Sequence, residues 1–250
     1  MLQVKNLTKV YDDGTVALED VSFEVPEGQF LAVIGLSGSG KSTLLRCINR
    51  LIDPTEGQIL WKGEDITAAN HEDLRNIRRR IGMVFQHFNL VHRSKVITNV
   101  LAGRLGYTSP ALSVVNRFSK TDREEAMRLL ERVGLEEKAH NRSEELSGGQ
   151  QQRVGIARAM MQEPDMILAD EPVASLDPVL AHSIMQFLET INRDDGVTVL
   201  CSLHFLDLVQ RYGQQVIALN EGRKVFEGTP SEIDDEMFKE IYGREAERVG

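Results

Sequence analysis

One segment of the chain combines glycines, a lysine and hydroxyl side chains at a spacing that suits phosphate binding. Residues 35–43 fit the pattern G-x-x-x-x-G-K-[ST] and directly follow an apolar run at 30–34, as a loop leaving a buried strand should. Glycines let successive backbone N–H groups turn toward a phosphate chain, and the following helix N-terminus adds positive partial charge. Lys41 would neutralise the β- and γ-phosphates, and the Ser42 hydroxyl would bind Mg²⁺. The expected phosphate contacts are Gly35, Ser37, Gly38, Gly40, Lys41, Ser42 and Thr43.

Two adjacent carboxylates follow a later apolar run at 166–169. A parallel sheet presents such residues to a ligand at its carboxyl edge. Asp170 would position the hydrated Mg²⁺, and Glu171 would polarise the water that attacks the γ-phosphorus, acting as general base. A strand that ends in Asp-Glu is, taken alone, more often a solvated turn. Because the phosphate loop precedes it in the same chain, we interpret the pair as the catalytic half of a nucleoside-triphosphate site.

A second anion-binding helix start is expected where a serine and two glycines precede a helical run that extends to Met161. A simple phosphate-loop enzyme needs only one helix terminus beside its nucleotide. A second one therefore suggests that two chains share each nucleotide. The residues expected to serve this purpose are Ser147, Gly148, Gly149 and Gln150.

The apolar pattern around these segments predicts an α/β protein. Before residue 30, apolar and polar residues alternate and are interrupted at 12–14 and 26–28, which indicates antiparallel strands with tight turns. From about 87 to 164 the apolar spacing is helical, whereas the later short apolar runs are typical of a parallel sheet covered on both faces. Further strands are expected at 57–63, 81–86, 166–169, 197–201 and 216–219, and helices at 42–51 and 231–250.

These elements predict one domain over residues 1–250. Residues 1–87 and 165–250 would form a nucleotide-binding α/β core, and residues 88–164 would form a helical subdomain inserted into it.

Composition limits the classes of protein that fit. A chain of 250 residues with 41% hydrophobic content can bury one large core, and its apolar stretches are too short to cross a bilayer. The N-terminus does not begin a signal peptide, so we expect the chain to stay in the cytoplasm. A formal charge of −9 argues against general binding of nucleic acid. Cys47 and Cys201 are expected to be buried free thiols rather than a disulfide or a metal site.

The order of these motifs resembles that of the ATP-binding cassette ATPases over essentially the whole chain. The Leu-Ser-Gly-Gly-Gln segment at 146–150, placed between the two phosphate-site motifs, is highly specific for that family. The resemblance implies a phosphate-loop NTPase (RecA-like) core with an N-terminal antiparallel β-subdomain and an inserted α-helical subdomain. It also implies a homodimer in which two cassettes close head to tail over two ATP molecules, so that Ser147 and Gly149 of one chain meet the γ-phosphate bound by the other.

The same resemblance assigns roles to four further residues. Tyr11 would stack on adenine, and Gln86 would touch Mg²⁺ and the attacking water. Asp177 would lie in the dimer-contact loop, and His204 would touch the γ-phosphate. Taken singly, Tyr11 also fits an ordinary strand aromatic, Gln86 a surface amide and His204 a helix cap; their order and spacing favour the functional roles.

Three stretches, at 99–107, 169–178 and 201–204, look like those of the phosphonate import ATPases. This implies separate transmembrane permease subunits, an extracytoplasmic solute-binding protein and a peripheral place on the cytoplasmic face of the inner membrane. Phe88 and Leu90 would then either contact the permease or fill the core between subdomains. Phe205-Leu206, where a polar residue is expected, and a variable insertion at 109–119 depart from the pattern and leave the solute open.

Other interpretations remain. The chain also fits the ATPase of a phosphate, phosphite or other solute importer, or an exporter subunit, and a neighbouring gene for a binding protein would favour import. A soluble cassette ATPase acting on DNA or ribosomes would bring two cassettes or a long coiled-coil insertion, and neither is present.

Overall fold

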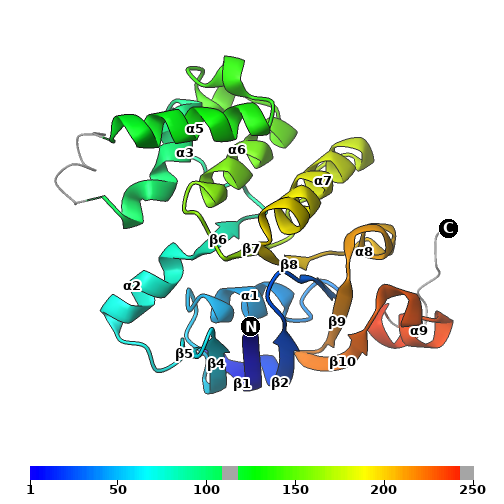
Figure 1. Ribbon diagram of the computed structural model, residues 1–250. Coiled ribbons are helices and arrows are strands. Elements are labelled where there is room, and N and C mark those ends of the chain that lie inside the picture. The colour runs from blue at the N-terminus through cyan, green and yellow to red at the C-terminus, as the bar shows by residue number, and fades with distance from the viewer. Residues whose placement is uncertain (109–117, 243–250) are drawn as a thin grey trace.

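The computed structural model describes residues 1–108 and 118–242. Two β-sheets and a group of helices make up this part of the chain (Figure 1). In the described residues, no helix is long and apolar enough to span a bilayer.

The larger sheet is mainly parallel and buried on both faces. Its neighbouring strands pair in parallel, except that β10 pairs antiparallel with β9 at one edge. Along β3, Phe30, Ala32 and Ile34 enter one hydrophobic cluster while Leu31 and Val33 enter another on the opposite face. Burial of each of these side chains except that of Ala32 contributes roughly 1.5–3 kcal/mol. The strand order is β10 (Arg223–Gly228), β9 (Gln215–Asn220), β3 (Phe30–Ile34), β8 (Thr198–Ser202), β7 (Met166–Ala169) and β6 (Ile81–Val84).

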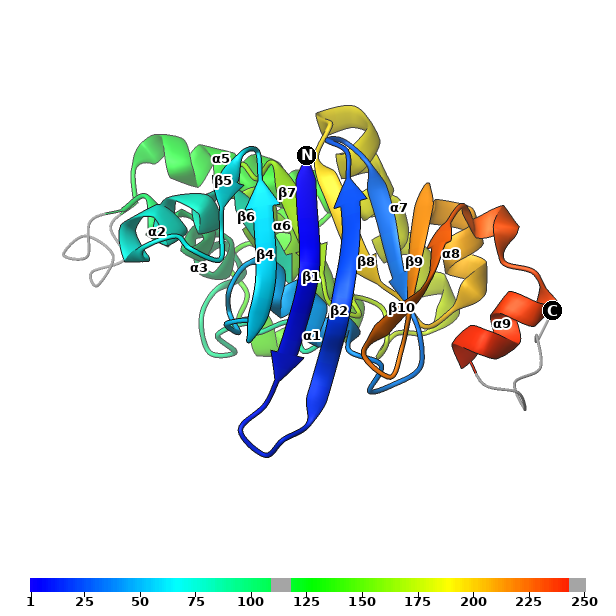
Figure 2. The same ribbon diagram turned by 90° about the horizontal axis from the view of Figure 1, so that it is seen from below.

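The smaller sheet is antiparallel and faces the larger one across a shared core (Figure 2). The expected turns at 12–14 and 26–28 bound its second strand, which confirms the N-terminal prediction. Helix α1 (Lys41–Ile48) supplies Leu44, Leu45 and Ile48 to the same core. This packing fixes the loop between β3 and α1. The strand order is β2 (Val16–Val25), β1 (Leu2–Val10), β4 (Glu56–Trp61) and β5 (Glu64–Asp65).

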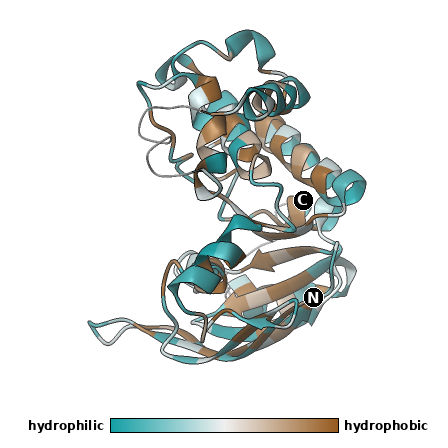
Figure 3. Cartoon of the chain, turned by 60° about the vertical axis from the view of Figure 1, so that its left-hand side comes forward, coloured by the Kyte–Doolittle hydropathy of each residue, from teal (hydrophilic) through white to brown (hydrophobic). Residues whose placement is uncertain are grey.

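The segment expected to be helical has a hydrophobic cluster of its own. Hydrophobic and hydrophilic residues alternate along its helices (Figure 3). Glycine is required at 103, where η1 meets the end of α6, because a Cβ there would lie 2.3 Å from the Arg158 carbonyl oxygen. The limits at 88 and 164 stay a prediction. The helical elements are α3 (Val96–Leu101), the 3-10 helices η1 (Ala102–Gly106), η2 (Glu136–Lys138) and η3 (Ser143–Glu145), α5 (Lys120–Arg132) and α6 (Gly148–Met160).

The remaining helices flank the larger sheet, and some boundaries differ from expectation. The helix expected to reach residue 51 ends at Ile48, and the strand expected to reach residue 86 ends at Val84. In the C-terminal segment the helical part is short, and residues 243–250 lie outside the described residues, as does most of the expected insertion at 109–119. Neither β5 nor β10 was predicted. These helical elements are α2 (His71–Arg79), α7 (Pro178–Asp195), α8 (Leu206–Tyr212), η4 (Pro230–Glu232) and α9 (Asp235–Tyr242).

Candidate active site

The loop between β3 and α1 folds tightly because glycine occupies its close approaches. Gly35 and Gly40 have φ values of +143° and +105°, and a Cβ on Gly40 would lie 2.4 Å from the Ala17 carbonyl oxygen. The Lys41 ammonium donates hydrogen bonds to the carbonyl oxygens of Gly35 and Leu36, both at 2.9 Å. The lysine therefore spans the mouth of its own loop, where a phosphate oxygen would be the competing acceptor.

Lys41 and Asp170 are buried, and Glu171 beside them is partly exposed. Only 3% of its side chain is exposed, and its Nζ lies 3.9 Å from Glu171 Oε1. Burial lowers the pKa of Lys41, while the charges of Glu171 and Asp170 act in the opposite direction. A phosphate chain at this position would add further stabilising negative charge.

Asp170 follows β7 and is almost fully buried among hydrogen-bond donors. The Ser42 hydroxyl donates to its Oδ1 at 2.6 Å, and the Arg46 guanidinium donates to its Oδ2 at 3.0 Å. Two of the three predicted Mg²⁺ contacts, Ser42 and Asp170, are thus adjacent, and both offer the oxygen atoms that a hard cation prefers. The described residues hold no cluster of three or more His, Cys, Asp or Glu side chains that could bind a metal by itself. This donor set fits Mg²⁺, which usually takes its remaining ligands from phosphate and water.

Glu171 is held in a left-handed backbone conformation, with φ of +48°. Its backbone N–H donates to the Ser202 hydroxyl at 2.8 Å, and its Oε1 lies 2.5 Å from His204 Nε2. The structure therefore brings the predicted base and the predicted histidine into direct contact. A non-glycine residue at such a φ costs on the order of 1–3 kcal/mol, so the Ser202 contact helps to fix the carboxylate in place.

Two residues of this arrangement were missed at the level of sequence, Ser202 and Arg46. Ser202 is fully buried and also donates to Asp170 Oδ1 at 3.4 Å. Arg46 stands four positions after Ser42 on α1, so both side chains share one helix face and reach the same carboxylate. The i,i+4 spacing of Ser42 and Arg46 was a usable signal.

A pocket of about 250 Å³ opens beside the phosphate loop. The Tyr11 hydroxyl lies 3.1 Å from Thr43 Oγ1, so the aromatic ring stands at the entrance to the loop. Of the predicted residues, Tyr11, Glu171 and five of the seven phosphate-loop residues line this pocket, whereas Gly35 and Ser37 do not. It is lined by Tyr11, Thr15, Val16, Ala17, Gly38, Gly40, Lys41, Ser42, Thr43 and Glu171.

The residues of the second helix start do not line this pocket. Ser147 caps α6: its Oγ accepts from the Gln150 N–H at 3.4 Å, and Gln150 Oε1 accepts from the Ser147 N–H at 3.0 Å. Asp177 likewise caps α7, accepting from the N–H groups of Val179 and Leu180, both at 3.1 Å. The two helix starts adjoin, because a Cβ on Gly149 would lie 3.1 Å from Leu180.

Gln86, Asp170 and His204 also lie outside the pocket lining. Gln86, in the loop that follows β6, is half-buried, and Gly148 packs near the ring of Phe88. Of the pair left open between permease contact and core, Leu90 is buried in the helical cluster and Phe88 packs partly against it. The core interpretation therefore holds for Leu90.

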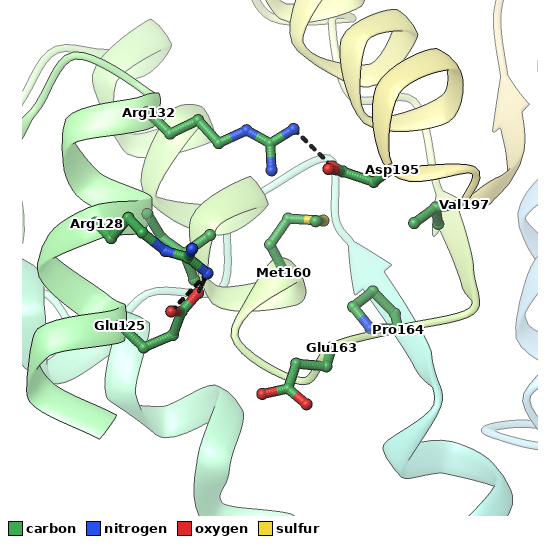
Figure 4. A pocket seen from close by; sticks show the side chains of 9 residues that line it. Glu125, Arg128, Arg132, Met160, Glu163, Pro164, Asp195 and Val197 are labelled. Carbon is green, nitrogen blue, oxygen red and sulfur yellow. Dashed lines mark hydrogen bonds and ion pairs between the residues drawn. The ribbon is translucent and has the colours of Figure 1, made fainter. Parts of the chain in front are cut away.

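A larger pocket of about 410 Å³ lies between α5, the end of α6 and the end of α7 (Figure 4). Four of its charged groups form two pairs: Arg132 donates to Asp195 at 2.6 Å, and Arg128 pairs with Glu125 at 2.7 Å. The fifth, Glu163, pairs with Arg104 outside the pocket at 3.2 Å. Its lining contains none of the predicted site residues, so it is not where the phosphate chemistry is expected.

Comparison with known proteins gives consistent matches along the chain. Residues 18–174 match the ABC transporter family. Phosphonates import ATP-binding protein PhnC of Bdellovibrio bacteriovorus is 51% identical over 250 residues, covering 100% of this chain and 96% of the relative. The protein of the same name from Staphylococcus aureus is 50% identical over 252 residues, covering 100% and 98%.

Solved structures agree with this match. The dimeric post-hydrolysis state of the ATP-binding cassette MJ0796 bound to ADP and Pi is 36% identical, has a TM-score of 0.82, and is matched over 92% of this chain and 99% of that one. A nucleotide-free ATP-binding cassette from an ABC transporter is 30% identical, with a TM-score of 0.81 and coverage of 96% and 94%.

Proposed function

The chain belongs to the ABC transporter family of ATPases, and on that premise we propose that it is the ATP-hydrolysing subunit of a phosphonate importer. The observation that carries the catalytic part is the contact of Glu171 with His204 next to Lys41 of the phosphate loop. The part concerning the solute is supported by full-length relatives, about half identical, that are named for phosphonate import.

The side chains divide the work of hydrolysis among them. Lys41 exchanges the carbonyl oxygens of its own loop for β- and γ-phosphate oxygens, and Tyr11 stacks on the adenine. Glu171 accepts a proton from the attacking water, and His204, 2.5 Å from it, contacts the γ-phosphate. Mg²⁺, held by Ser42 and Asp170 and touched by Gln86, would supply positive charge that offsets the negative charge of the phosphates.

Each ATP site is completed by a second copy of the chain. We assign Ser147, Gly148, Gly149 and Gln150 to the γ-phosphate bound by the partner, and Asp177 to the dimer contact. In support, the capped start of α6 lies outside the pocket of its own chain, and a cassette of the same fold is described as a dimer bound to ADP and Pi. ATP would thus stabilise the closed dimer through contacts that exist only in that state.

The other partners are permease subunits and an extracytoplasmic solute-binding protein, with the ATPase bound at the cytoplasmic face of the inner membrane. A groove of about 250 Å³ between α2 and η1 supports a docking surface for the permease at this place. Its end is fixed by Tyr107, whose hydroxyl donates to the carbonyl oxygens of Arg79 and Gln162 at 3.2 and 3.1 Å. The 99–107 stretch therefore joins α2 to the end of α6.

The test compares the native chain with Glu171→Gln and with Glu56→Gln, a change at an exposed residue on β4. We expect Glu171→Gln to bind ATP but to release phosphate at least about 100-fold more slowly, because removal of a general base costs about two to four orders of magnitude. It should also elute as a dimer when ATP is present, while Glu56→Gln behaves as the native chain does. Rapid turnover by Glu171→Gln would overturn the assignment of the base.

A further inference from the structure

The loop that carries Gln86 contains two consecutive residues in the left-handed region. Phe88 and Asn89 have φ values of +57° and +49°. Neither is glycine, and although asparagine visits this region more readily than most residues, phenylalanine is unfavourable there. Contacts from elsewhere must therefore hold the loop in this shape.

Those contacts come from one arginine on α6. The Arg158 guanidinium donates to the Phe88 carbonyl oxygen at 2.9 Å and to the Asn89 carbonyl oxygen at 2.5 Å. Burial lowers the pKa of Arg158, and within the described parts of the chain no carboxylate lies at ion-pair distance from it. Arg158 is half-buried, and a guanidinium partly withdrawn from water normally pairs with an acid. Here its known partners are the carbonyl oxygens of the two left-handed residues.

The same face of α6 accommodates the rest of the loop. Gly155 faces the loop, since a Cβ there would lie in ordinary contact with the Phe88 carbonyl oxygen, at 3.9 Å. One end of the loop's path is marked by Gly148, where a Cβ would lie 3.7 Å from the Phe88 ring. Phe88 thus lies along α6 from its first turn to Arg158, and α6 also packs on β6, the strand that leads into the loop (Figure 1).

We infer that Arg158 is a positioning residue that ties the Gln86 loop to α6, the helix whose N-terminus carries Ser147. A displacement of α6 then moves Gln86 with it, so the amide reaches its catalytic position only when α6 is correctly placed. The inference rests on the proposed function, because it takes Gln86 as the contact to Mg²⁺ and the attacking water.

The first test reads the loop without nucleotide. Amide hydrogen exchange of residues 86–91 is compared in the native chain, Arg158→Met, Arg158→Lys and the control Arg153→Met. Arg153 is on the same helix and donates to the Val133 carbonyl oxygen at 3.1 Å, away from the loop. We expect exchange to rise at least about 10-fold in Arg158→Met, since two charge-assisted hydrogen bonds are lost. Arg158→Lys should be intermediate, and Arg153→Met should match the native chain. Native-like exchange in Arg158→Met would overturn the inference.

The second test reads catalysis through a double-mutant cycle with Gln86→Ala. Arg158→Met should lower kcat by about 10- to 100-fold with KM for ATP unchanged, because misplacing a catalytic contact by about 1 Å can cost two orders of magnitude. In the Gln86→Ala background the same change should add little. Equal losses in both backgrounds would show a general structural effect and contradict the inference.

The two tests separate failure of the inference from failure of the proposed function. If the native chain had no ATPase activity, the proposed function would be wrong, while hydrogen exchange would still decide whether Arg158 holds the loop. If Arg158→Met did not fold, Arg158→Lys would take its place in both tests. A smaller rise in hydrogen exchange and a smaller fall in kcat would then support the inference.

Discussion

Replacing Ser202 by alanine tests how the catalytic carboxylate is held in place. The Ser202 hydroxyl is fully buried, accepts the Glu171 N–H at 2.8 Å and donates to Asp170 Oδ1 at 3.4 Å. Its removal leaves a buried N–H without its acceptor, which costs about 1–3 kcal/mol. If Glu171 then relaxes from its φ of +48°, part of that loss is recovered, but the carboxylate moves.

The effects of Ser202→Ala on stability and on the rate of hydrolysis are measured separately. Urea unfolding should show a loss of stability of at most about 1–3 kcal/mol. Single-turnover phosphate release should slow by about 10- to 100-fold, because a shift of about 1 Å in a catalytic group is sufficient. ATP affinity should change little, since Lys41 and the phosphate loop are intact.

Ser143→Ala is the matched control. Ser143 is also fully buried, and its hydroxyl accepts from the Asn99 amide at 2.8 Å in the helical subdomain, away from the carboxylates. It should lose a similar amount of stability and keep its rate of phosphate release. A native rate in Ser202→Ala, or an equal loss of rate in Ser143→Ala, would refute the reasoning.

Three further predictions concern charge, thiols and backbone. Burial lowers the pKa of Lys41 in the free protein, and a bound phosphate chain raises it again. ATP affinity should therefore be highest at pH values below the pKa of the free protein and fall as the pH rises through that pKa. Calorimetry over about pH 7–10 that shows constant ATP affinity would contradict this. Burial raises the pKa of Cys47 to about 12 and also raises that of Cys201. A thiol reagent at neutral pH should therefore label neither cysteine until the protein is unfolded. Rapid labelling of the folded chain would contradict the burial of the two thiols. Gly40→Ala should lower the urea midpoint more than Gly14→Ala does. Gly40 has a φ of +105° and its new Cβ would lie 2.4 Å from a carbonyl oxygen, whereas nothing lies within 4 Å of a Cβ on Gly14. Equal midpoints would show that the clash at Gly40 is relieved.

The phosphate loop and the central strands were predictable because their signals are local. A glycine pattern after an apolar run specifies a loop that leaves a buried strand, and the runs at 166–169 and 216–219 lie within observed strands. Strand β10 at the edge of the sheet has no fully buried residue and gives no comparable signal.

The role of Ser202 could not be predicted, because it depends on which strands are neighbours. In the observed register Ala169 pairs with Cys201, which places Asp170 and Ser202 side by side at the ends of β7 and β8. Sequence periodicity does not determine strand order, so it cannot bring these two residues together. The same limit applies to Arg158, whose partners lie 69 and 70 positions away in the sequence.

Uptake of labelled phosphonate and labelled phosphate, measured side by side in cells that carry either the native chain or Glu171→Gln, tests the central claim most directly. The account predicts that Glu171→Gln abolishes phosphonate uptake and leaves phosphate uptake unchanged, because the phosphonate permease would have lost its source of ATP hydrolysis. Unchanged phosphonate uptake in cells that depend on this chain would contradict the claim.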